Sequence, residues 1–230
     1  MTTDTIEVET GNGTPRSSII WLHGLGADGH DFEPIVPELR LPDTLQLRFV
    51  FPNAPLRPVT INGGMMMRAW YDILTLDRDG PNDDAGVRAS GAILDGLILR
   101  EQQRGIAASR IVVAGFSQGG AIALHSGLRS KQKLAGIMAL STYLPIRASF
   151  ATEVVAPADC GYTDVPILMA HGSLDPVLPM ALGRSSADLL AANGFRVEWH
   201  EYPMAHSVCR EEIEDIRQWL LAVFSDERHS

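Results

Sequence analysis

Six short apolar runs are spaced along the chain, and polar residues, glycine or proline bound each of them. They lie at 18–24, 47–55, 110–116, 134–141, 165–172 and 195–203. Runs of this length, rich in Val, Ile, Leu, Met and aromatic residues, are typical of buried β-strands. The run at 195–203 alternates apolar and polar residues, which indicates a strand with one solvated face.

Four longer stretches carry apolar residues at helical spacing. They lie at 84–105, 119–130, 181–194 and 210–224. The last is the clearest, because one stripe of it holds Ile213, Ile216, Trp219, Leu220 and Val223. Gly105 follows two arginines in the last turns of the first stretch, and it predicts where that helix ends.

Strands that alternate with helices predict an α/β fold with a mostly parallel central sheet and helices on both faces. No composition break marks a linker, so we expect one domain over residues 1–230. We expect residues 1–17 to be peripheral and to add an edge strand or hairpin. Residues 53–83, which are rich in Pro, Gly, Asn and Asp, and residues 145–164 form irregular stretches that we expect to flank an active site.

Charge and composition narrow the classes of function. The chain has 230 residues and a formal net charge of −9, which does not favour binding to nucleic acid or to an anionic membrane surface. Its start is unlike a secretory signal, and no apolar run approaches the roughly 18 residues of a membrane span. Cys160 and Cys209 fit neither a disulfide framework nor a metal site. We expect a cytoplasmic monomer or homodimer with reduced thiols and no stable membrane insertion.

Ser117 stands in a G-x-S-x-G motif between a predicted strand and a predicted helix. In a sharp strand-to-helix turn such a serine projects its hydroxyl, and the flanking glycines, Gly115 and Gly119, remove side chains that would clash. The N-terminus of the following helix favours a negative charge beside the serine. The motif alone also fits an ordinary serine in a glycine-rich turn, so its partners must be found.

A serine hydroxyl needs a neighbouring base at neutral pH. The histidines that follow Ser117 are His125, His171, His200, His206 and His229. His206 lies in a loop between the last predicted strand and the C-terminal helix, where an imidazole can turn between nucleophile and leaving group. The other four are expected, in chain order, inside a helix, at a strand end that shapes a turn, in a half-solvated strand and in the tail. We therefore choose His206.

The acid that orients this base is expected just past the carboxyl end of a strand, where catalytic groups of open α/β sheets gather. Asp175 has that position, after the run at 165–172. Its task would be to hold one tautomer of His206 and to stabilise the imidazolium. Asp159 and Asp164 precede the strand in an irregular stretch, and Asp188 falls in the middle of a predicted helix.

An acyl-transfer site also needs two N–H donors for the oxyanion. One is expected from the backbone of Gln118, the residue after the nucleophile. The segment LHGLGADG at 22–29 follows an early strand, and its glycines let the backbone turn N–H groups inward. By position we choose Leu25 as the second donor, although His23 and Gly24 could simply end the strand.

Six motifs in one order resemble a known family. They are LHGLGADGHDF, FPNAPLRPVTINGGMMMRAWYDI, GFSQGGA, LSTYLP, HGSLDPVLP and AHSVCREEIEDIRQWL, which extend from about residue 18 to residue 224. Together they resemble the carboxylesterase and acyl-protein thioesterase (phospholipase/carboxylesterase) family of α/β-hydrolases, of the bacterial carboxylesterase type. The resemblance implies an α/β-hydrolase fold without a large cap domain. It also implies a serine hydrolase of carboxylic esters and, in some members, of acylated-protein thioesters or lysophospholipids.

The resemblance maps catalytic roles onto residues already chosen. The nucleophile, acid and base map to Ser117, Asp175 and His206. The oxyanion donors map to the N–H groups of Leu25 and Gln118. No family signature maps onto 147–164, RASFATEVVAPADCGYTD, so the resemblance leaves chain-length preference open.

The family's N-G-G…W-Y-D loop lies beside the acyl-binding site, which places three methionines and a tryptophan near the substrate. Met is flexible and suits acyl chains of varied shape. If the run is extended, Met65 and Met67 face one way and Met66 the other. We expect the substrate to contact Met65, Met67, Trp70 and Val177. Asp72 is expected to accept hydrogen bonds while the segment from Trp70 pins the loop to the body.

The sequence therefore predicts a serine esterase for short to medium acyl chains, with possible activity on acyl thioesters, through an acyl-enzyme. Its substrate would be a small-molecule or lipid ester or an acylated protein, and no metal or organic cofactor is needed. An acyltransferase with the same triad and a non-catalytic ligand-binding homologue are the alternatives. The chain retains all three triad members, which argues against the non-catalytic alternative.

Overall fold

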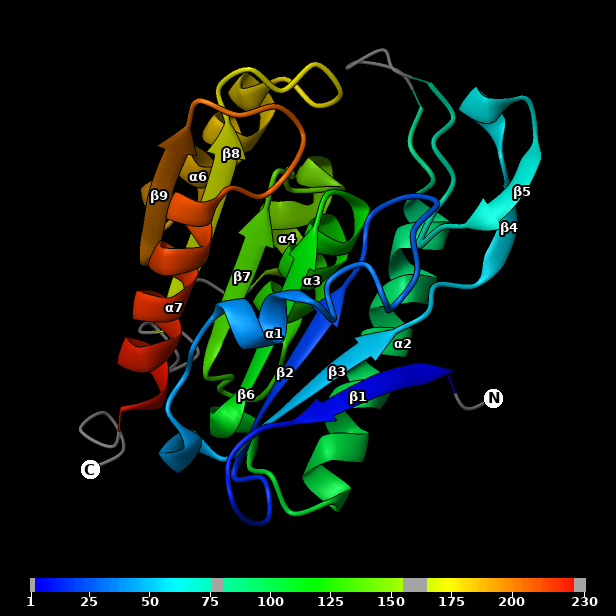
Figure 1. Ribbon diagram of the computed structural model, residues 1–230. Helices are drawn as coiled ribbons and strands as arrows, with labels where there is room; N and C mark the ends of the chain where they lie inside the picture. The colour runs from blue at the N-terminus through cyan, green and yellow to red at the C-terminus, as the bar shows by residue number, and fades with distance from the viewer. Residues whose placement is uncertain (1–2, 76–80, 155–164, 226–230) are drawn as a thin grey trace.

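A seven-stranded sheet runs through the protein in the computed structural model, which describes residues 3–75, 81–154 and 165–225 (Figure 1). Its strands, in spatial order, are β1 (Thr5–Glu9), β3 (Leu47–Pro52), β2 (Ser17–Leu22), β6 (Ile111–Phe116), β7 (Gly136–Leu140), β8 (Ile167–Gly172) and β9 (Val197–Tyr202). β1 pairs antiparallel with β3, and the remaining pairs are parallel. The predicted mostly parallel sheet is confirmed, and each of the six apolar runs coincides with one of its strands to within a few residues at either end.

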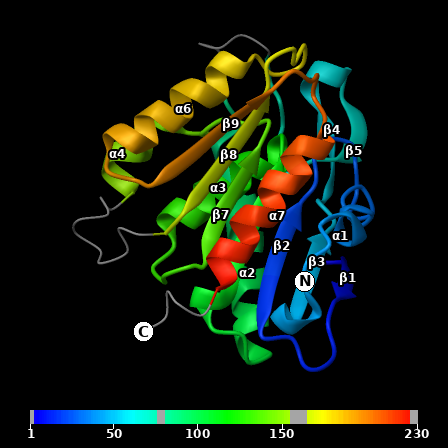
Figure 2. The ribbon, with the colours of Figure 1, turned by 60° about the vertical axis from the view of Figure 1, so that its left-hand side comes forward.

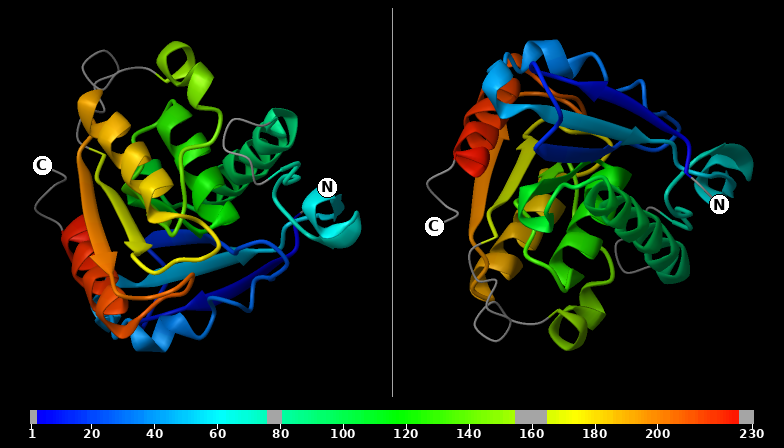
Figure 3. Two further views of the ribbon diagram at one scale, coloured as in Figure 1. Left: turned by 90° about the horizontal axis from the view of Figure 1, so that it is seen from above. Right: turned by 90° about the horizontal axis from the view of Figure 1, so that it is seen from below.

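Helices cover both faces of this sheet (Figures 2 and 3). One face carries α2 (Asp84–Gln103), α3 (Gln118–Arg129), α4 (Phe150–Glu153) and α6 (Met180–Ala192), and the other carries α1 (Ile35–Glu38) and α7 (Arg210–Phe224). Short 3₁₀ turns lie at Asp43–Leu45, Thr60–Asn62, Ala108–Arg110 and Arg147–Ser149. Within the described ranges, no helix is long and apolar enough to cross a lipid bilayer.

The two-sided burial explains why the strand sequences are continuously apolar. Side chains alternate between the faces of a strand, so both sets must be apolar when both faces are covered. In β6, Ile111 and Val113 join the core under α2 and α3, whereas Val112, Ala114 and Phe116 join the core under α7. Each core is therefore built from every second residue of the same strands.

The segment 53–83 contains more regular structure than its Pro and Gly content predicts. β4 (Leu56–Val59) and β5 (Met65–Arg68) pair antiparallel, and the turn between them uses Gly63 and Gly64 at positive φ. This hairpin stands apart from the main sheet (Figure 1). Residues 76–80 of this segment, and 155–164 of the second irregular stretch, lie outside the described residues.

The strand order places two loops together at the carboxyl edge of the sheet. β2 and β6 are neighbours, and the chain continues from them in opposite directions across the sheet. Such a switch point opens a crevice between the loops that follow the two strands, where open α/β sheets bind ligands. The loops in question begin at His23 and Ser117, the two segments that the sequence analysis selected.

A buried acid near the start of α7 gives the fold a measurable pH dependence. The Glu212 side chain is fully buried, and neither carboxylate oxygen has a hydrogen-bond partner among the described residues. Burial, together with the nearby charge of Asp215, raises the pKa of Glu212 to about 8, although the Cys209 backbone N–H acts in the opposite direction. The folded protein therefore keeps this proton where the unfolded chain has released it.

Replacing Glu212 by Gln should stabilise the protein at alkaline pH. The folded state binds more protons than the unfolded state between pH values of about 4.5 and 8, so wild-type stability falls as pH rises through this window. We expect Glu212→Gln to match the wild type near pH 5 and to exceed its unfolding free energy by about 2–3 kcal/mol above pH 8. Thermal unfolding across this range measures the difference. Glu214→Gln, on an exposed residue of the same helix, is the control. A difference that does not vary with pH would contradict the assignment.

Candidate active site

Ser117 occupies a strained turn between β6 and α3. Its φ of 54° and ψ of −120° place a residue with a Cβ in a backbone region that L-residues rarely adopt. Two hydrogen bonds hold the turn, from the Ser117 N–H to the Leu140 carbonyl at 2.9 Å and from Thr142 Oγ1 to the Ser117 carbonyl at 2.7 Å. The side chain is partly exposed, so its hydroxyl is accessible at the sheet's carboxyl edge.

The glycines around Ser117 are required by close backbone contacts. A Cβ on Gly115 would lie 2.2 Å from the Gly119 carbonyl carbon. A Cβ on Gly119 would lie 2.3 Å from the Leu22 carbonyl oxygen, and one on Gly120 would lie 2.8 Å from a Thr142 side-chain carbon. The expected removal of clashing side chains is thus seen at both flanking glycines. The contact with Leu22 also brings the loop after β2 directly against the start of α3.

His206 and Asp175 are joined by a short hydrogen bond. Nδ1 of His206 lies 2.6 Å from Oδ2 of Asp175, and the Asp175 side chain has no exposed surface. Because the carboxylate accepts, Nδ1 carries the proton and Nε2 keeps a lone pair. This is the tautomer that a general base needs when its second nitrogen faces a hydroxyl.

The turn after β8 holds the Asp175 carboxylate in place. Oδ1 accepts hydrogen bonds from the backbone N–H groups of Val177 and Leu178, each at 2.8 Å. Burial alone would raise the pKa of Asp175, but the bonds from Leu178, His206 and Val177 outweigh it and keep this pKa below its usual value. The carboxylate is therefore charged at neutral pH and presents Oδ2 to His206.

Contacts from two strands set the position of His206 beside the elbow. A Cβ on Gly172, at the end of β8, would lie 2.3 Å from the Met204 carbonyl oxygen, so this glycine lets the loop after β9 pack against β8. The His206 ring lies against the ring of Phe116, with their centroids 4.7 Å apart. Phe116 directly precedes Ser117, so the imidazole is adjacent to the serine turn. No hydrogen bond joins Ser117 Oγ to His206 among the described residues, as is common before substrate binds.

Two backbone N–H groups border the crevice between β2 and β6. Gln118 is the first residue of α3, so its N–H has no acceptor within the helix. Among the described residues, the Leu25 N–H also has no acceptor, whereas the next N–H, of Gly26, bonds the Arg68 carbonyl at 2.9 Å. The buried His23 ring holds the start of this loop, because its Nε2 accepts from the Ala54 N–H at 3.0 Å. Both expected oxyanion donors thus lie beside backbone that is held by hydrogen bonds or by the helix.

The Gln118 side chain ties the 53–83 segment to the serine turn. Its Oε1 accepts from the Trp70 N–H at 3.0 Å, and its Nε2 donates to the Tyr71 carbonyl at 2.8 Å. Trp70 Nε1 donates to the His23 carbonyl at 2.9 Å. Trp70 therefore bridges the two segments that carry the candidate oxyanion donors, which agrees with the prediction that the segment from Trp70 pins the loop to the body.

The four expected substrate residues fall into different environments. Trp70 is fully buried, so in this structure it supports the loop and offers no surface to a substrate. Met67 is half-buried, and its sulfur lies 3.9 Å from where a Cβ on Gly26 would stand, beside the Leu25 loop. Met65 and Val177 are exposed, at 63% and 64%. β5 is extended, so Met65 and Met67 share one side of it and Met66 faces the other.

The structure also places the side chains that were expected to lie outside the chemistry. Asp72 accepts hydrogen bonds from the N–H and the hydroxyl of Thr60, as predicted. His125 is buried in α3, and His200 bonds Glu198 at 2.9 Å. His171, which was expected to shape a turn, does contact one, because its buried Nε2 lies 2.9 Å from the Leu178 carbonyl oxygen; the same nitrogen also lies 3.4 Å from Asp175 Oδ2. The sequence feature that could have indicated this proximity is the position of His171 at a strand end, four residues before Asp175. Asp159, Asp164, Cys160 and His229 lie outside the described residues.

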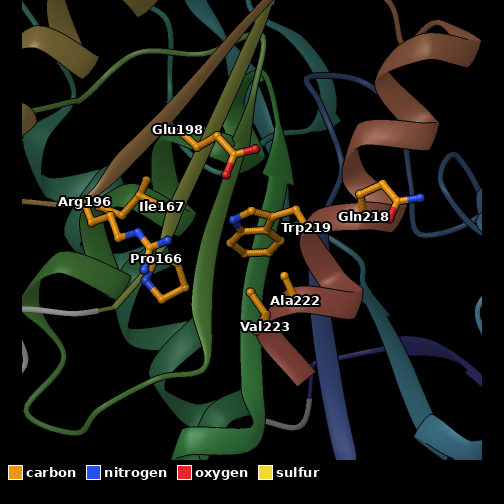
Figure 4. Close-up of a pocket in the computed structure, with 8 residues that line it drawn as sticks. All are labelled: Pro166, Ile167, Arg196, Glu198, Gln218, Trp219, Ala222 and Val223. Atoms are coloured by element: carbon orange, nitrogen blue, oxygen red, sulfur yellow. The ribbon is translucent and has the colours of Figure 1, made fainter. Parts of the chain in front are cut away.

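A separate pocket lies at the other end of the sheet (Figure 4). It encloses about 220 Å³ and is lined by Pro166, Ile167, Arg196, Glu198, Gln218, Trp219, Ala222 and Val223. Trp219 points toward the residues of β8 and β9, whereas Gln218 points away from them (Figure 4). The lining residues come from the amino ends of β8 and β9 and from α7, so the pocket is distinct from the crevice at the carboxyl ends of the strands. Across the described part of the chain, no group of three or more His, Cys, Asp or Glu could hold a metal ion.

The chain is similar in sequence and in structure to known proteins. The sequence pattern of the phospholipase/carboxylesterase family matches residues 3–224. An acyl-protein thioesterase 1 of Neurospora crassa is 43% identical over 211 residues, which cover 89% of this chain and 85% of that protein. An acyl-protein thioesterase 1 of Mycosarcoma maydis is 41% identical, with 90% of each chain covered. The crystal structure of Zea mays acyl-protein thioesterase 2 superposes with a TM-score of 0.86 at 31% identity, covering 97% of this chain and 100% of that one.

Proposed function

The chain belongs to the phospholipase/carboxylesterase family and is a serine hydrolase of esters and thioesters; from this premise we propose that Ser117, His206 and Asp175 carry out the hydrolysis. The α/β-hydrolase fold that the sequence predicted is thereby confirmed, and the residues that the structure describes include no large cap domain. The observation that carries the proposal is the 2.6 Å bond between His206 and a buried Asp175, beside a serine in a strained strand-to-helix turn.

In the acylation half-reaction, His206 Nε2 takes the proton of the Ser117 hydroxyl as Oγ attacks the carbonyl carbon. The electron pair of the C=O bond moves to the oxygen and forms a tetrahedral intermediate. Asp175 stabilises the imidazolium through Nδ1 without taking its proton. The intermediate then collapses, the bond to the alcohol or thiol breaks, and His206 returns the proton to the leaving group.

In the deacylation half-reaction, water replaces the leaving group. His206 Nε2 takes a proton from the water as its oxygen attacks the acyl carbon of the Ser117 ester. Collapse of the second intermediate breaks the bond to Oγ, and Oγ recovers the proton from His206. The products are a carboxylic acid and the regenerated serine, so the two steps need no further reactant.

The oxyanion of each intermediate is proposed to lie between the N–H groups of Leu25 and Gln118. Such preorganised donors stabilise charge that develops only in the transition state. Their support comes from the bonds that fix Gly26, His23 and Gln118 to the segment of Trp70. The partial positive charge at the N-terminus of α3 acts on the same oxygen.

The substrates we propose are acyl esters and thioesters with short to medium chains, carried by a small molecule, a lipid or a protein. Exposed apolar residues support this assignment, because Leu174 and Val177 lie on the turn of Asp175, and Leu56 and Met65 lie on the β4–β5 hairpin. Met67 beside the Leu25 loop can follow acyl chains of varied shape. We also propose a cytoplasmic location, where the free thiol of Cys209 stays reduced.

A chain-length series tests this function. We expect p-nitrophenyl acetate, butyrate and octanoate to be hydrolysed with kcat/KM at least about tenfold above that of the palmitate, and octanoyl-CoA to be cleaved as a thioester faster than palmitoyl-CoA. A fluorophosphonate probe should label the active protein. Absence of both labelling and turnover would favour a ligand-binding protein, and ester formation with added alcohol in place of hydrolysis would favour an acyltransferase.

A further inference from the structure

His171 is a buried imidazole next to the candidate site that the proposed mechanism does not use. It is the penultimate residue of β8, four positions before Asp175, and its side chain has no exposed surface. Its ring stacks on the indole of Trp199 from β9, with centroids 6.3 Å apart. A histidine in this position can act only through the groups that it touches, because no substrate can reach it.

The surroundings of His171 determine where its proton lies. Nε2 is 2.9 Å from the Leu178 carbonyl oxygen, which can only accept, so Nε2 carries the hydrogen. Nδ1 is buried without a hydrogen-bond partner among the described residues, and a Cβ on Gly183 of α6 would lie 2.6 Å from it. Burial keeps the pKa of His171 below its usual value, although the Leu178 carbonyl and Asp175 act in the opposite direction. The ring is therefore neutral, with its donor aimed at the 175–178 turn.

Two imidazoles face the same oxygen of Asp175. His206 Nδ1 lies 2.6 Å and His171 Nε2 lies 3.4 Å from Oδ2, while the N–H groups of Val177 and Leu178 occupy Oδ1. Among the described residues, these histidines are the titratable side chains in contact with Asp175. The carboxylate thus accepts three hydrogen bonds, and His171 approaches Oδ2 while bonding the carbonyl of Leu178, which supplies one of the three donors.

We propose that His171 is a positioning residue for Asp175: its single Nε2–H holds the 175–178 turn through the Leu178 carbonyl and also lies 3.4 Å from Oδ2, the oxygen that bonds His206. This inference rests on the proposed function, because it assumes that Asp175 orients His206. Without His171, the conformation of the 175–178 turn would depend more heavily on the two hydrogen bonds that the Val177 and Leu178 N–H groups donate to Oδ1 of Asp175. The Nε2–H also shares part of the negative charge of Oδ2, so removing it leaves more of that charge facing Nδ1 of His206.

Substitutions that keep or remove the Nε2 donor test the proposal. A Gln amide reaches the position of the imidazole Nε2, whereas Asn is too short and Leu has no donor. We expect His171→Leu and His171→Asn to lower kcat about tenfold with KM within about twofold, because His171 lies outside the substrate's reach. The acid limb of the pH profile of kcat/KM should move upward by about half a pH unit. His171→Gln should retain kcat within about threefold and the wild-type pH profile.

Two further variants distinguish a loss of the Nε2 donor from disturbed packing around His171 and from an error in the proposed triad. Trp199→Phe disturbs the ring that stacks on His171 but keeps the donor, and it should leave kcat and the pH profile unchanged. A pH profile that stays in place in folded His171→Leu and His171→Asn would overturn the proposal, as would equal losses in Leu, Asn and Gln. Asp175→Asn, measured alongside, addresses the parent assumption. If Asp175→Asn is fully active, the proposed triad fails. If it is impaired while all His171 variants are normal, only the role of His171 fails.

Discussion

Ser117→Ala should lower kcat/KM for p-nitrophenyl butyrate by about 10⁴- to 10⁶-fold and leave the fold intact. The hydroxyl is the only part of the side chain removed, and without it no acyl-enzyme can form. The backbone strain at φ 54° remains, because alanine has the same Cβ as serine. The close contacts of Gly115 and Gly119, which involve backbone atoms, are also unaltered. We therefore expect an unchanged thermal midpoint together with loss of fluorophosphonate labelling.

Initial rates with the ester series, paired with probe labelling, measure this effect. Ser130→Ala is the matched control, because it removes a hydroxyl at the other end of the same helix, where Ser130 bonds Gln132. Residual turnover above the uncatalysed rate is compatible with the proposal, since the oxyanion donors remain. Activity of Ser117→Ala within tenfold of the wild type would exclude Ser117 as the nucleophile.

Asp175→Asn should lower kcat by about 10²- to 10⁴-fold through the wrong imidazole tautomer. The N–H groups of Val177 and Leu178 both point at Oδ1, so the amide oxygen of Asn must take that place. Its NH₂ group then faces His206 Nδ1, which must accept instead of donate. The proton of the neutral imidazole moves to Nε2, which can no longer receive the proton of Ser117.

Steady-state kinetics of Asp175→Asn measure this loss, with Asp188→Asn as the control. Asp188 lies on α6, exposed, and pairs with Arg184 at 3.2 Å, so its substitution changes charge by the same amount away from the crevice. Because the pKa of Asp175 is below its usual value, the wild-type carboxylate stays charged throughout the neutral range and its own titration does not limit activity there. A loss well under a hundredfold would argue against Asp175 as the orienting acid.

The periodic elements could be predicted because each carries its signal within a few turns or a few residues. The predicted helix 210–224 coincides with α7, where an apolar stripe and an acidic first turn agree. The sequence predicts a loop where the β4–β5 hairpin lies, because each strand is only four residues long, Pro58 interrupts the first, and Gly63 and Gly64 lie between them. No local periodicity distinguishes such a short, exposed pair from an irregular loop.

The candidate triad could be selected from chain order and strand ends, but the partners of the supporting residues could not. A tryptophan is a typical residue of an apolar binding site, but the side chain of Trp70 is buried. Trp70 forms hydrogen bonds to His23 and Gln118, which precede and follow it in the chain by 47 and 48 residues. The sequence predicts only that His171 shapes a turn. The short distance between His171 and Asp175 depends on how the end of β8 packs against α6. Both roles arise from atoms that only folding brings together.

The amino-acid sequence by itself determined the alternation of strands and helices, the family and the residues with the chemistry for acyl transfer, because periodicity and motif spacing are local properties of the chain. The tertiary structure decided which nitrogen of His206 carries the proton, which side chains hold Asp175 and the oxyanion loops, and which expected substrate residues are exposed. Those features depend on distances of a few ångströms between segments that are distant in the chain, and on burial, which no single segment contains.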